Sequence, residues 1–204
     1  MDQSTVCAIL LAAGEGKRMG TQKLLLPFGD TTVAGASLRA LLGSRVAQVV
    51  VVLGHQAEEV RQSLSQQAEA AAQSLPVKFV LNDRYQEGMF SSVLCGLAAA
   101  ATDADAFLIS LADQPAITSQ VIDALLAAFF KQGPEIALPT YHGRRGHPLL
   151  FHRRYLDEVR RLDPQAGLRG LLSLHPDKLL EVPVDTSAVV RDIDYWDDYL
   201  SQRP

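Results

Sequence analysis

The chain turns glycine-rich and cationic immediately after its first apolar run, where it reads Leu11-Ala12-Ala13-Gly14-Glu15-Gly16-Lys17-Arg18-Met19-Gly20-Thr21-Gln22-Lys23. The run itself, at residues 6–11, has the length and β-rich composition of a buried strand. Ligands bind at the carboxyl ends of the strands in an open parallel sheet, so this loop is well placed to hold phosphates. Its glycines let backbone N–H groups approach phosphate oxygens, while Arg18 and Lys23 supply charge. The alternative is a flexible surface loop whose basic residues are incidental.

Four further apolar runs recur along the chain, at residues 49–53, 77–81, 107–111 and 136–138. Short runs that are apolar on both faces are typical of strands covered by helices on both sides of a mostly parallel sheet. Helical patterns accompany them, at residues 33–42, 57–74, 89–100 and 153–161. This alternation of strands and helices predicts a doubly wound α/β sheet.

Two local signals refine this pattern. Thr118 can cap a further helix, and Ile117 before it can pack onto Ile122 as a hydrophobic staple. Beyond the last apolar run, the glycine-rich stretch at residues 141–148 lies between extended segments. It predicts a small hairpin insertion that interrupts the regular winding.

Length, charge and composition limit the class of protein. At 204 residues the chain fits one α/β domain, residues 1–204, better than two small ones. A formal net charge of −4 argues against broad nucleic-acid binding, which needs a clustered Lys/Arg surface. The sequence shows neither a signal peptide nor an apolar run near the ~20 residues of a membrane span. Cys7 and Cys95 lack metal-like spacing and are predicted to be buried thiols, so we expect a cytoplasmic protein without a membrane partner.

Two well-known phosphate-binding motifs come close to the first loop and fail. The P-loop needs G-x-x-x-x-G-K-[ST], whereas Gly20 is followed by Thr21 and Lys23 comes later. The dinucleotide fingerprint needs G-x-G-x-x-G and an acidic residue at the end of the second strand. Here the glycines stand at 14, 16 and 20, and the second predicted strand ends without an acidic residue. A nicotinamide dehydrogenase is therefore disfavoured.

The first loop resembles the signature L-A-[AG]-G-x-[GS]-x-R-M-G-x-x-K of the MobA-like NTP transferase family, nucleotidyltransferases with a Rossmann-like domain. The chain is most similar to its molybdenum cofactor cytidylyltransferase branch. The resemblance covers nearly the whole chain and includes Val52-Leu53-Gly54-His55, Gly88-Met89-Phe90-Ser91-Ser92, Leu111-Ala112-Asp113-Gln114-Pro115, Gly146-His147-Pro148 and Asp192-Ile193-Asp194. It implies a Rossmann-like, doubly wound, mostly parallel sheet with a small hairpin insertion, a nucleotide-diphospho-sugar transferase-like fold.

The resemblance assigns the first loop to the nucleotide. It implies nucleotide binding by Leu11, Ala12, Ala13, Gly14, Gly16, Lys23 and Gly54. Arg18 and Lys23 would be catalytic, because they neutralise the triphosphate as pyrophosphate leaves. Lys23 matters most, since a fixed cation acts more strongly on charge that grows in the transition state than on the ground state. We expect Lys23 to be a solvent-facing loop cation that contributes little to packing.

Carboxylates at two places are implied to bind the metal. Asp113 ends an apolar strand and would be a catalytic ligand of Mg2+, a hard cation that uses few carboxylates plus phosphate oxygens. Its alternative role is to cap the turn before Pro115. Asp192 would be the second ligand, with Asp194 as the alternative, and Ile193 would point to the opposite face of an extended stretch. The family usually continues with T-P-E-D, but this chain reads Tyr195-Trp196-Asp197-Asp198.

The segment before the third predicted helix allows two interpretations. Asn82, Ser91 and Ser92 match the family segment that shapes the nucleoside pocket, so the resemblance implies that they bind the nucleotide. Either serine could instead be the N-terminal cap of the helix that follows, because serine hydroxyls readily accept from the first free N–H groups of a helix.

The hairpin stretch is implied to bind the acceptor. His147, in Gly-His-Pro, would lie where the acceptor enters, beside Arg144 and Arg145. The two arginines could bind an acceptor phosphate, or they could simply keep a hairpin soluble. The remaining histidines have no ligand-like spacing and are interpreted as surface or turn residues.

The resemblance implies an enzyme that transfers CMP from CTP to the molybdopterin molybdenum cofactor, releasing pyrophosphate and forming the cytosine dinucleotide cofactor. The acceptor phosphate can attack the α-phosphorus directly, so no protein nucleophile is needed. Guanylyl-transferring members typically read L-A-G-G at the first turn, and the methyl group of Ala13 here narrows the space for a purine. A molybdenum hydroxylase would receive the product.

Other functions remain open from the sequence. The acceptor could be a sugar phosphate or an alditol phosphate. The protein could also be a non-catalytic carrier or chaperone of the molybdenum cofactor, although intact Lys23 and Asp113 argue against carriage alone. Some relatives are oxidoreductases that act on unrelated substrates, so the resemblance does not by itself fix the reaction.

Overall fold

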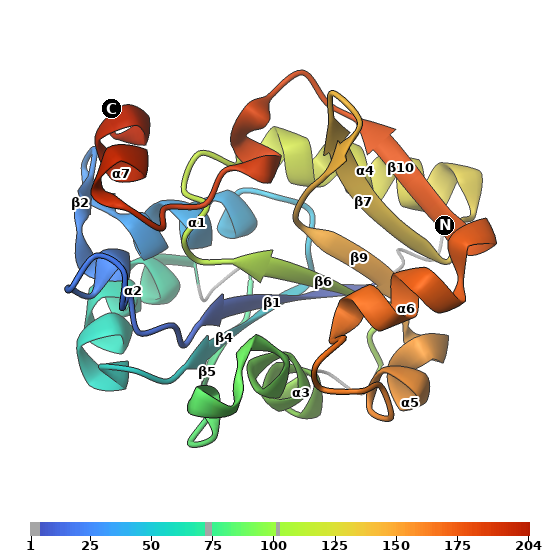
Figure 1. Ribbon diagram of the computed structural model, residues 1–204, viewed down its shortest axis with the longest axis horizontal. Coiled ribbons are helices and arrows are strands. Elements are labelled where there is room, and N and C mark those ends of the chain that lie inside the picture. The colour runs from blue at the N-terminus through green and yellow to red at the C-terminus, as the bar shows by residue number, and fades with distance from the viewer. Residues whose placement is uncertain (1–4, 72–74, 101–102) are drawn as a thin grey trace.

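The computed structural model describes residues 5–71, 75–100 and 103–204, and its centre is an eight-stranded sheet (Figure 1). The strands are β1 (Val6–Ala12), β4 (Gln48–Leu53), β5 (Val77–Leu81), β6 (Ala106–Leu111), β7 (Ile136–Tyr141), β8 (Arg144–Arg145), β9 (Leu149–His152) and β10 (Leu179–Pro183). Their order is β10-β7-β9-β6-β1-β4-β5, and β8 pairs with β7. A separate pair joins β2 (Pro27–Phe28) to β3 (Thr31–Thr32).

Helices cover both faces of the sheet because its central strands are apolar on both faces. In β1, Ala8 and Leu10 pack into one core cluster, and Cys7 and Ile9 pack into the other. The first cluster is covered by α1 (Val33–Leu42), α2 (Ala57–Ala71), α4 (Ser119–Gln132) and α7 (Trp196–Gln202). The second is covered by α3 (Met89–Ala99), α5 (Leu156–Val159) and α6 (Leu168–Leu174). The predicted doubly wound fold is therefore confirmed.

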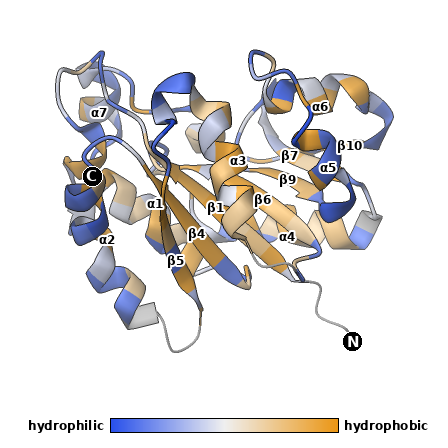
Figure 2. Cartoon of the chain, turned by 90° about the horizontal axis from the view of Figure 1, so that it is seen from below, coloured by the Kyte–Doolittle hydropathy of each residue, from blue (hydrophilic) through white to orange (hydrophobic). Residues whose placement is uncertain are grey.

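Hydropathy separates the layers (Figure 2). The strands of the sheet are mostly apolar, and α3 is apolar along much of its length, whereas α2 presents a largely hydrophilic surface. Helix α3 lies unusually close to the sheet at Gly96, where an added Cβ would come within 2.3 Å of a methyl carbon of Ile9 and 2.9 Å of one of Val52. Only glycine leaves enough room for this contact.

The predicted hairpin is present and changes the strand directions. β7 pairs antiparallel with β8 through Thr140 and Tyr141, and β9 inserts between β6 and β7, antiparallel to both. β10 returns parallel to β7 at the edge of the sheet. The described sheet is therefore mostly parallel, with the short strands β8 and β9 antiparallel to their neighbours where the winding is interrupted.

Most predicted elements are confirmed, with small differences at their ends. The predicted helix at 57–74 is described as far as residue 71, and residues 72–74 lie outside the described part. The single helix predicted at 153–161 is wrong, since a 3-10 turn at Arg153–Tyr155 precedes the four-residue α5. Thr118 is the N-cap of α4, but its side chain makes no capping hydrogen bond. Cys7 is buried as predicted, whereas Cys95 is only partly buried.

Loops meet at the carboxyl edge of β1, β4 and β6 and are tied together through backbone hydrogen bonds. The N–H of His55 donates to the carbonyl of Ala13 at 3.2 Å, and that of Ile193 donates to Asp113 at 2.9 Å. Segments distant in sequence are thus fixed beside one another at the edge where a parallel sheet binds ligands. No helix in the described residues is both long and apolar enough to cross a membrane.

Candidate active site

A cavity of about 400 Å³, here called the central cavity, opens at this edge of the sheet. Among the predicted site residues, its lining includes Leu11, Ala13, Gly14, Lys23, Ser92, Asp113 and Asp192. These residues come from the first loop, the start of α3, the end of β6 and the segment before α7. Residues that are far apart in the sequence therefore converge on one cavity.

Lys23 is the charged centre of this site. It begins a 3-10 helix, Lys23–Leu25, that ends the glycine-rich loop. Its Nζ lies 2.6 Å from Oδ2 of Asp113 and 2.9 Å from Oδ1 of Asp194. Only 8% of the residue is exposed, so the expectation of a solvent-facing loop cation is wrong. The two carboxylates make its burial tolerable, because a buried ammonium group needs charged partners.

The pKa values of this cluster follow from the ion pairs. Burial lowers the pKa of Lys23, but attraction to Asp113 and Asp194 outweighs that effect and raises the pKa overall. Burial raises the pKa of Asp194, but hydrogen bonding and attraction to Lys23 and Arg18 bring it below its usual value. Both groups are therefore held in their charged forms at neutral pH.

The three aspartates are arranged differently around the cavity. Ile193 is fully buried, whereas its neighbours Asp192 and Asp194 are exposed and partly exposed. The isoleucine side chain therefore points away from the two carboxylates, as expected for an extended stretch. Asp192 is exposed and lines the central cavity, and in the described residues its carboxylate has no hydrogen-bond or ion-pair partner. Asp194 instead pairs with Lys23 and with Arg18.

This donor set fits a hard divalent cation. Oxygen ligands from one or two carboxylates, completed by phosphate oxygens and water, are what Mg2+ prefers. Asp113 and Asp192 supply carboxylates on one wall of the central cavity. Within the described ranges, no group of three or more His, Cys, Asp or Glu side chains forms a ready-made metal site. A cation bound here would thus be held by these carboxylates together with oxygen atoms of a bound polyphosphate.

The first loop closes through its own backbone. The N–H of Met19 donates to Gly16 at 3.0 Å, and that of Gly20 donates to Lys17 at 3.3 Å. Ala12 is fully buried in the core, so its side chain faces away from the loop surface. Gly54 lies behind the first turn, where an added Cβ would come within 2.7 Å of the Ala13 methyl group. It would also come within 2.8 Å of Tyr85, so a glycine is required for the loop after β4 to pass between Ala13 and Tyr85.

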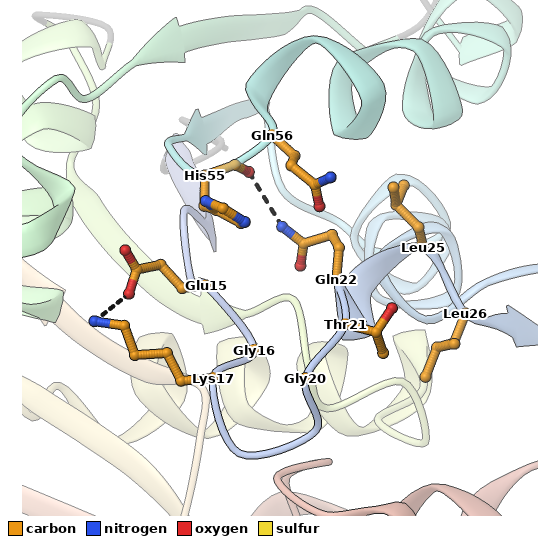
Figure 3. A pocket seen from close by; sticks show the side chains of 10 residues that line it. All are labelled: Glu15, Gly16, Lys17, Gly20, Thr21, Gln22, Leu25, Leu26, His55 and Gln56. Atoms are coloured by element: carbon orange, nitrogen blue, oxygen red, sulfur yellow. Dashed lines mark hydrogen bonds and ion pairs between the residues drawn. The ribbon is translucent and has the colours of Figure 1, made fainter.

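A second cavity, of about 530 Å³, borders the other side of this loop (Figure 3). The side chain of Gln22 points toward His55 and donates to its carbonyl at 3.1 Å, and it also donates to Gly14 at 3.3 Å. Lys17 forms an ion pair with Glu15 in the same view. Since Lys23 and Asp113 line the central cavity and not this one, the charged cluster belongs to the central cavity.

Asn82, Ser91 and Ser92 form a hydrogen-bonded group at the start of α3. The Asn82 amide nitrogen donates to both serine hydroxyls at 2.9 Å, and its carbonyl oxygen accepts from the N–H of Arg84 at 3.0 Å. The N-cap of α3 is Gly88, so the alternative that a serine caps this helix is wrong. Ser92 lines the central cavity, whereas Asn82 is occupied by protein partners.

A third cavity, of about 640 Å³, adjoins the central one and is here called the α6 cavity. The two cavities share Leu11, Met89 and Leu111 in their linings. Of the predicted acceptor residues, Arg145 and His147 line the α6 cavity, while Arg144 is exposed on β8 and is not part of the lining.

The ionisable side chains that line the α6 cavity are all basic, and they differ in their partners. The Arg145 guanidinium pairs with Glu181 of β10 at 2.7 Å. Burial lowers the pKa of His147; attraction to Asp113 and Asp192 partly opposes this, and repulsion from Arg169 adds to it. Arg169 of α6 lines the cavity, and within the described part of the chain its side chain has no hydrogen-bond or ion-pair partner.

Several side chains around these cavities were not predicted from the sequence. Arg169 carries no motif signal, since it lies in a short helix between the matches at residues 146–148 and 192–194. Tyr85 and Gln86 line the central cavity, and Tyr195 and Trp196 contact the first loop. The departure from T-P-E-D at residues 195–198 was the one signal that could have pointed to the last pair.

The comparisons with known proteins agree with this geometry. The model of the MobA-like NTP transferase domain matches residues 8–181. The chain is 34% identical to nicotine blue oxidoreductase of Paenarthrobacter nicotinovorans over 158 residues, covering 74% of this chain and 72% of that one. It is 24% identical to the molybdenum cofactor cytidylyltransferase of Escherichia coli K12, covering 98% and 96%.

Solved structures give the same result. Rv0371c from Mycobacterium tuberculosis H37Rv is similar with a TM-score of 0.79 at 29% identity, covering 100% of this chain and 99% of that one. Its complex with manganese is similar with a TM-score of 0.74 at 28% identity, covering 98% of each. A nucleotidyl transferase from Methanothermobacter, Mth528, reaches 0.78 at 25% identity, covering 98% and 96%. The chain belongs to the MobA-like NTP transferase family, and its fold is that of the nucleotide-diphospho-sugar transferases.

Proposed function

We propose that this protein transfers CMP from CTP to the molybdopterin form of the molybdenum cofactor and releases pyrophosphate. One observation carries the proposal: Lys23, Asp113 and Asp192 line the central cavity of about 400 Å³, which adjoins the α6 cavity of about 640 Å³ and shares lining residues with it. A nucleotide and an acceptor can thus lie side by side, with the charged cluster beside their junction.

The first loop and Lys23 would bind the triphosphate. Backbone groups from Leu11 to Gly14, together with Gly16, would hold the ribose and phosphates, with Gly54 packing behind them. An oxygen of the acceptor phosphate attacks the α-phosphorus, the bond to the bridging oxygen breaks, and pyrophosphate leaves with the electron pair. Lys23 and Arg18 would stabilise the charge that grows on pyrophosphate, which is worth most in a partly buried site.

Mg2+ is the proposed cofactor, held by Asp113 and Asp192. When bound, it would neutralise phosphate charge and orient the triphosphate for in-line attack. Asp192 is preferred over Asp194 because Asp192 lines the cavity with an unpaired carboxylate among the described residues, whereas Asp194 pairs with two cations. Asp113 would exchange part of its contact with Lys23 for the metal.

The nucleoside would be read by Ser92 and by the first turn. Ser92 is part of the lining of the central cavity and its hydroxyl accepts a hydrogen bond from Asn82, while Ser91 holds the turn before α3 through bonds to Arg84 and Gly88. Ala13 also lines this cavity and is 6% exposed. A methyl group at this position favours the smaller cytosine ring.

The acceptor would occupy the α6 cavity. Its lining is largely apolar, with Arg145, His147 and Arg169 as the cationic or ionisable exceptions. A tricyclic pterin could bury its rings against the apolar wall and direct its phosphate toward the junction with the central cavity. Arg144, outside the lining, could contact only the part of the acceptor that extends beyond the cavity.

The proposal places the enzyme in the cytoplasm, where a molybdenum hydroxylase would receive the product. The Escherichia coli relative, named for molybdenum cofactor cytidylyl transfer, supports the substrate pair across nearly the full chain. The manganese complex of Rv0371c supports a divalent cation in this family.

A second candidate function follows from the higher identity to nicotine blue oxidoreductase. In that case the central cavity would hold a nucleotide cofactor, and the α6 cavity would hold a flat, aromatic electron acceptor. A sugar or alditol phosphate acceptor, or carriage of the molybdenum cofactor without catalysis, are the remaining alternatives.

Pyrophosphate release separates these functions. The protein is incubated with Mg2+ and each of the four NTPs, with and without the molybdenum cofactor, and with a panel of sugar and alditol phosphates. Release that requires both CTP and the molybdenum cofactor supports the proposal, and Asp113→Asn serves as the inactive control. Cofactor binding without release would indicate a carrier, and oxidation of a nicotinamide cofactor without release would indicate an oxidoreductase.

A further inference from the structure

The segment Asp194-Tyr195-Trp196 lies against the outer side of the glycine-rich loop. The indole Nε1 of Trp196 donates to the carbonyl of Met19 at 3.3 Å. The guanidinium carbon of Arg18 lies 5.6 Å from the centre of the Tyr195 ring, and the same guanidinium pairs with Asp194. Three consecutive residues thus contact two consecutive residues of the loop.

This segment is itself firmly held. One carboxylate oxygen of Asp198 accepts from the N–H groups of Asp194 and Tyr195, at 3.1 and 2.8 Å. The Tyr199 hydroxyl donates to the carbonyl of Pro27 at 2.8 Å, and the Trp196 and Tyr199 rings meet edge to face at 5.9 Å. The contacts to the loop therefore come from a fixed support and not from a free chain end.

Burial does not explain why aromatic residues stand here. Tyr195 is 56% exposed and Trp196 is 47% exposed, so neither contributes a fully buried side chain to the core. What both do contribute is a directed contact, a hydrogen bond from an indole and a ring face beneath a guanidinium. The T-P-E-D residues usual in the family have no side chain able to make either contact at these two positions.

We propose that Tyr195 and Trp196 are positioning residues that hold residues 14–20 in the conformation that receives the triphosphate. The loop contains three glycines, so ordering it costs more backbone entropy than ordering an average segment. Contacts from outside the cavity order the loop before the ligand arrives, so less entropy is lost on binding. Tyr195 and Trp196 would thus strengthen nucleotide binding without contacting the nucleotide. The inference rests on the proposed nucleotide site.

Trp196 is the single tryptophan of the chain, so its fluorescence reports on the contact. Wild-type protein is titrated with CTP and Mg2+ while its emission is recorded, and binding is measured in parallel by calorimetry. We expect the emission maximum to change little on binding, because the contact to Met19 is already formed before the ligand arrives. A large shift of the emission maximum with the calorimetric midpoint would show that the contact forms only with the ligand, and would overturn the inference.

Substitutions test the same contact through kinetics. Trp196→Phe keeps an aromatic ring but removes the donor, and it should raise the KM for CTP about 2- to 10-fold with little change in kcat. Tyr195→Leu should raise it about 2- to 5-fold. Tyr141→Phe is the control, because it removes a tyrosine hydroxyl from β7, outside the first loop and α7. Equal KM values in all four proteins would contradict the proposal.

Hydrogen exchange separates this inference from the proposed function. Peptides covering residues 14–22 are followed in the absence of any ligand in wild type, Trp196→Phe and Tyr141→Phe. We expect faster exchange of the loop amides in Trp196→Phe alone. If wild type neither binds CTP nor releases pyrophosphate, the proposed function fails, and this exchange result still decides whether the contact orders the loop.

Discussion

The central cavity and the α6 cavity differ in how far the protein already satisfies their polar side chains. Around the central cavity, Lys23 pairs with two carboxylates, and Asn82 holds two serines. Around the α6 cavity, the side chains of His147 and Arg169 have no hydrogen-bond or ion-pair partner among the residues described. Two side chains depart from this contrast: Asp192 of the central cavity has no partner among the described residues, and Arg145 of the α6 cavity pairs with Glu181. The other charged side chains of the central cavity are paired before a ligand arrives, whereas His147 and Arg169 are available to one.

This difference separates chemistry from recognition of the acceptor. Groups that stabilise a transition state work best when they are fixed in advance, because no reorganisation is then needed during the reaction. A largely apolar cavity with a few available cations selects by shape and by one anionic group. The central cavity should therefore tolerate little change, and the α6 cavity should tolerate more.

Replacing a central carboxylate should have the largest effect. Asp113→Asn keeps the size of the side chain but removes the charge that would hold the metal, so turnover should fall on the order of 1,000-fold, which corresponds to about 4 kcal/mol. Initial rates of pyrophosphate release at several Mg2+ concentrations measure this. A loss of less than tenfold at all concentrations would remove Asp113 from the site, and Asp177→Asn, an exposed aspartate outside both cavities, is the control.

Lys23→Ala should lower kcat by about 100- to 1,000-fold, because it removes a fixed cation beside the leaving group. The burial of Lys23 adds a second effect, since the change leaves Asp113 without its cation and Asp194 with Arg18 as its remaining ion-pair partner among the described residues. We expect a loss of stability on the order of 1–3 kcal/mol. Thermal unfolding measures it, and Lys23→Arg should recover most of the stability but less of the rate. An unchanged Tm in Lys23→Ala would show that the ion pairs do not stabilise the fold.

Part of this arrangement was predictable from the sequence. The glycine-rich loop, the strand ends and Asp113 follow local patterns, so their positions could be predicted. The burial of Lys23 could not, because it depends on Asp194, which is 171 positions away in the sequence. Arg169 could not be predicted either, since it reaches its cavity only because α6 folds back over the second face of the sheet.

The choice of base should have an intermediate effect. Wild type should prefer CTP over GTP by roughly 10- to 200-fold, the range expected when a packed pocket excludes a larger ring. Ala13→Gly alone should admit GTP only weakly, because Ser92 and its partner Asn82 also shape the cavity. The measurement is kcat/KM for both nucleotides with the same acceptor. A wild-type preference for GTP would overturn the cytidylyl assignment and leave nucleotidyl transfer intact.

Substitutions in the α6 cavity should have smaller effects, and these should be confined to the KM for the acceptor. Arg169→Ala should raise the KM for the acceptor about tenfold, the cost of losing one charged hydrogen bond, and should leave the KM for CTP unchanged. Arg39→Ala is the control, since Arg39 of α1 is also exposed but pairs with Asp30 in the turn between β2 and β3, outside the α6 cavity. Equal changes in both KM values would show that the two cavities do not divide the substrates.

The smallest expected effect is a pH dependence of stability that originates at His147. Burial lowers its pKa in the folded state, so the folded protein binds fewer protons than the unfolded chain. Its contribution to stability is therefore complete above the unfolded value of about 6.5 and is lost as the pH falls through the lower folded value. Urea unfolding between pH 8 and pH 5 should show a weaker acid loss in His147→Asn than in wild type. If the free energy of unfolding depends on pH in the same way in both proteins, His147 is not the origin of the acid loss.

The contact at Gly96 fixes the distance between α3 and the sheet. Ser92 and Gly96 stand one helical turn apart on α3, and the backbone at Gly96 lies directly on Ile9 and Val52. The distance between α3 and the sheet therefore also sets the position of Ser92 in the lining of the central cavity. A redesign of the base preference must keep the contact at Gly96. Any side chain larger than that of glycine at this position would push α3 away from the sheet and displace Ser92, although position 96 lies outside the cavity.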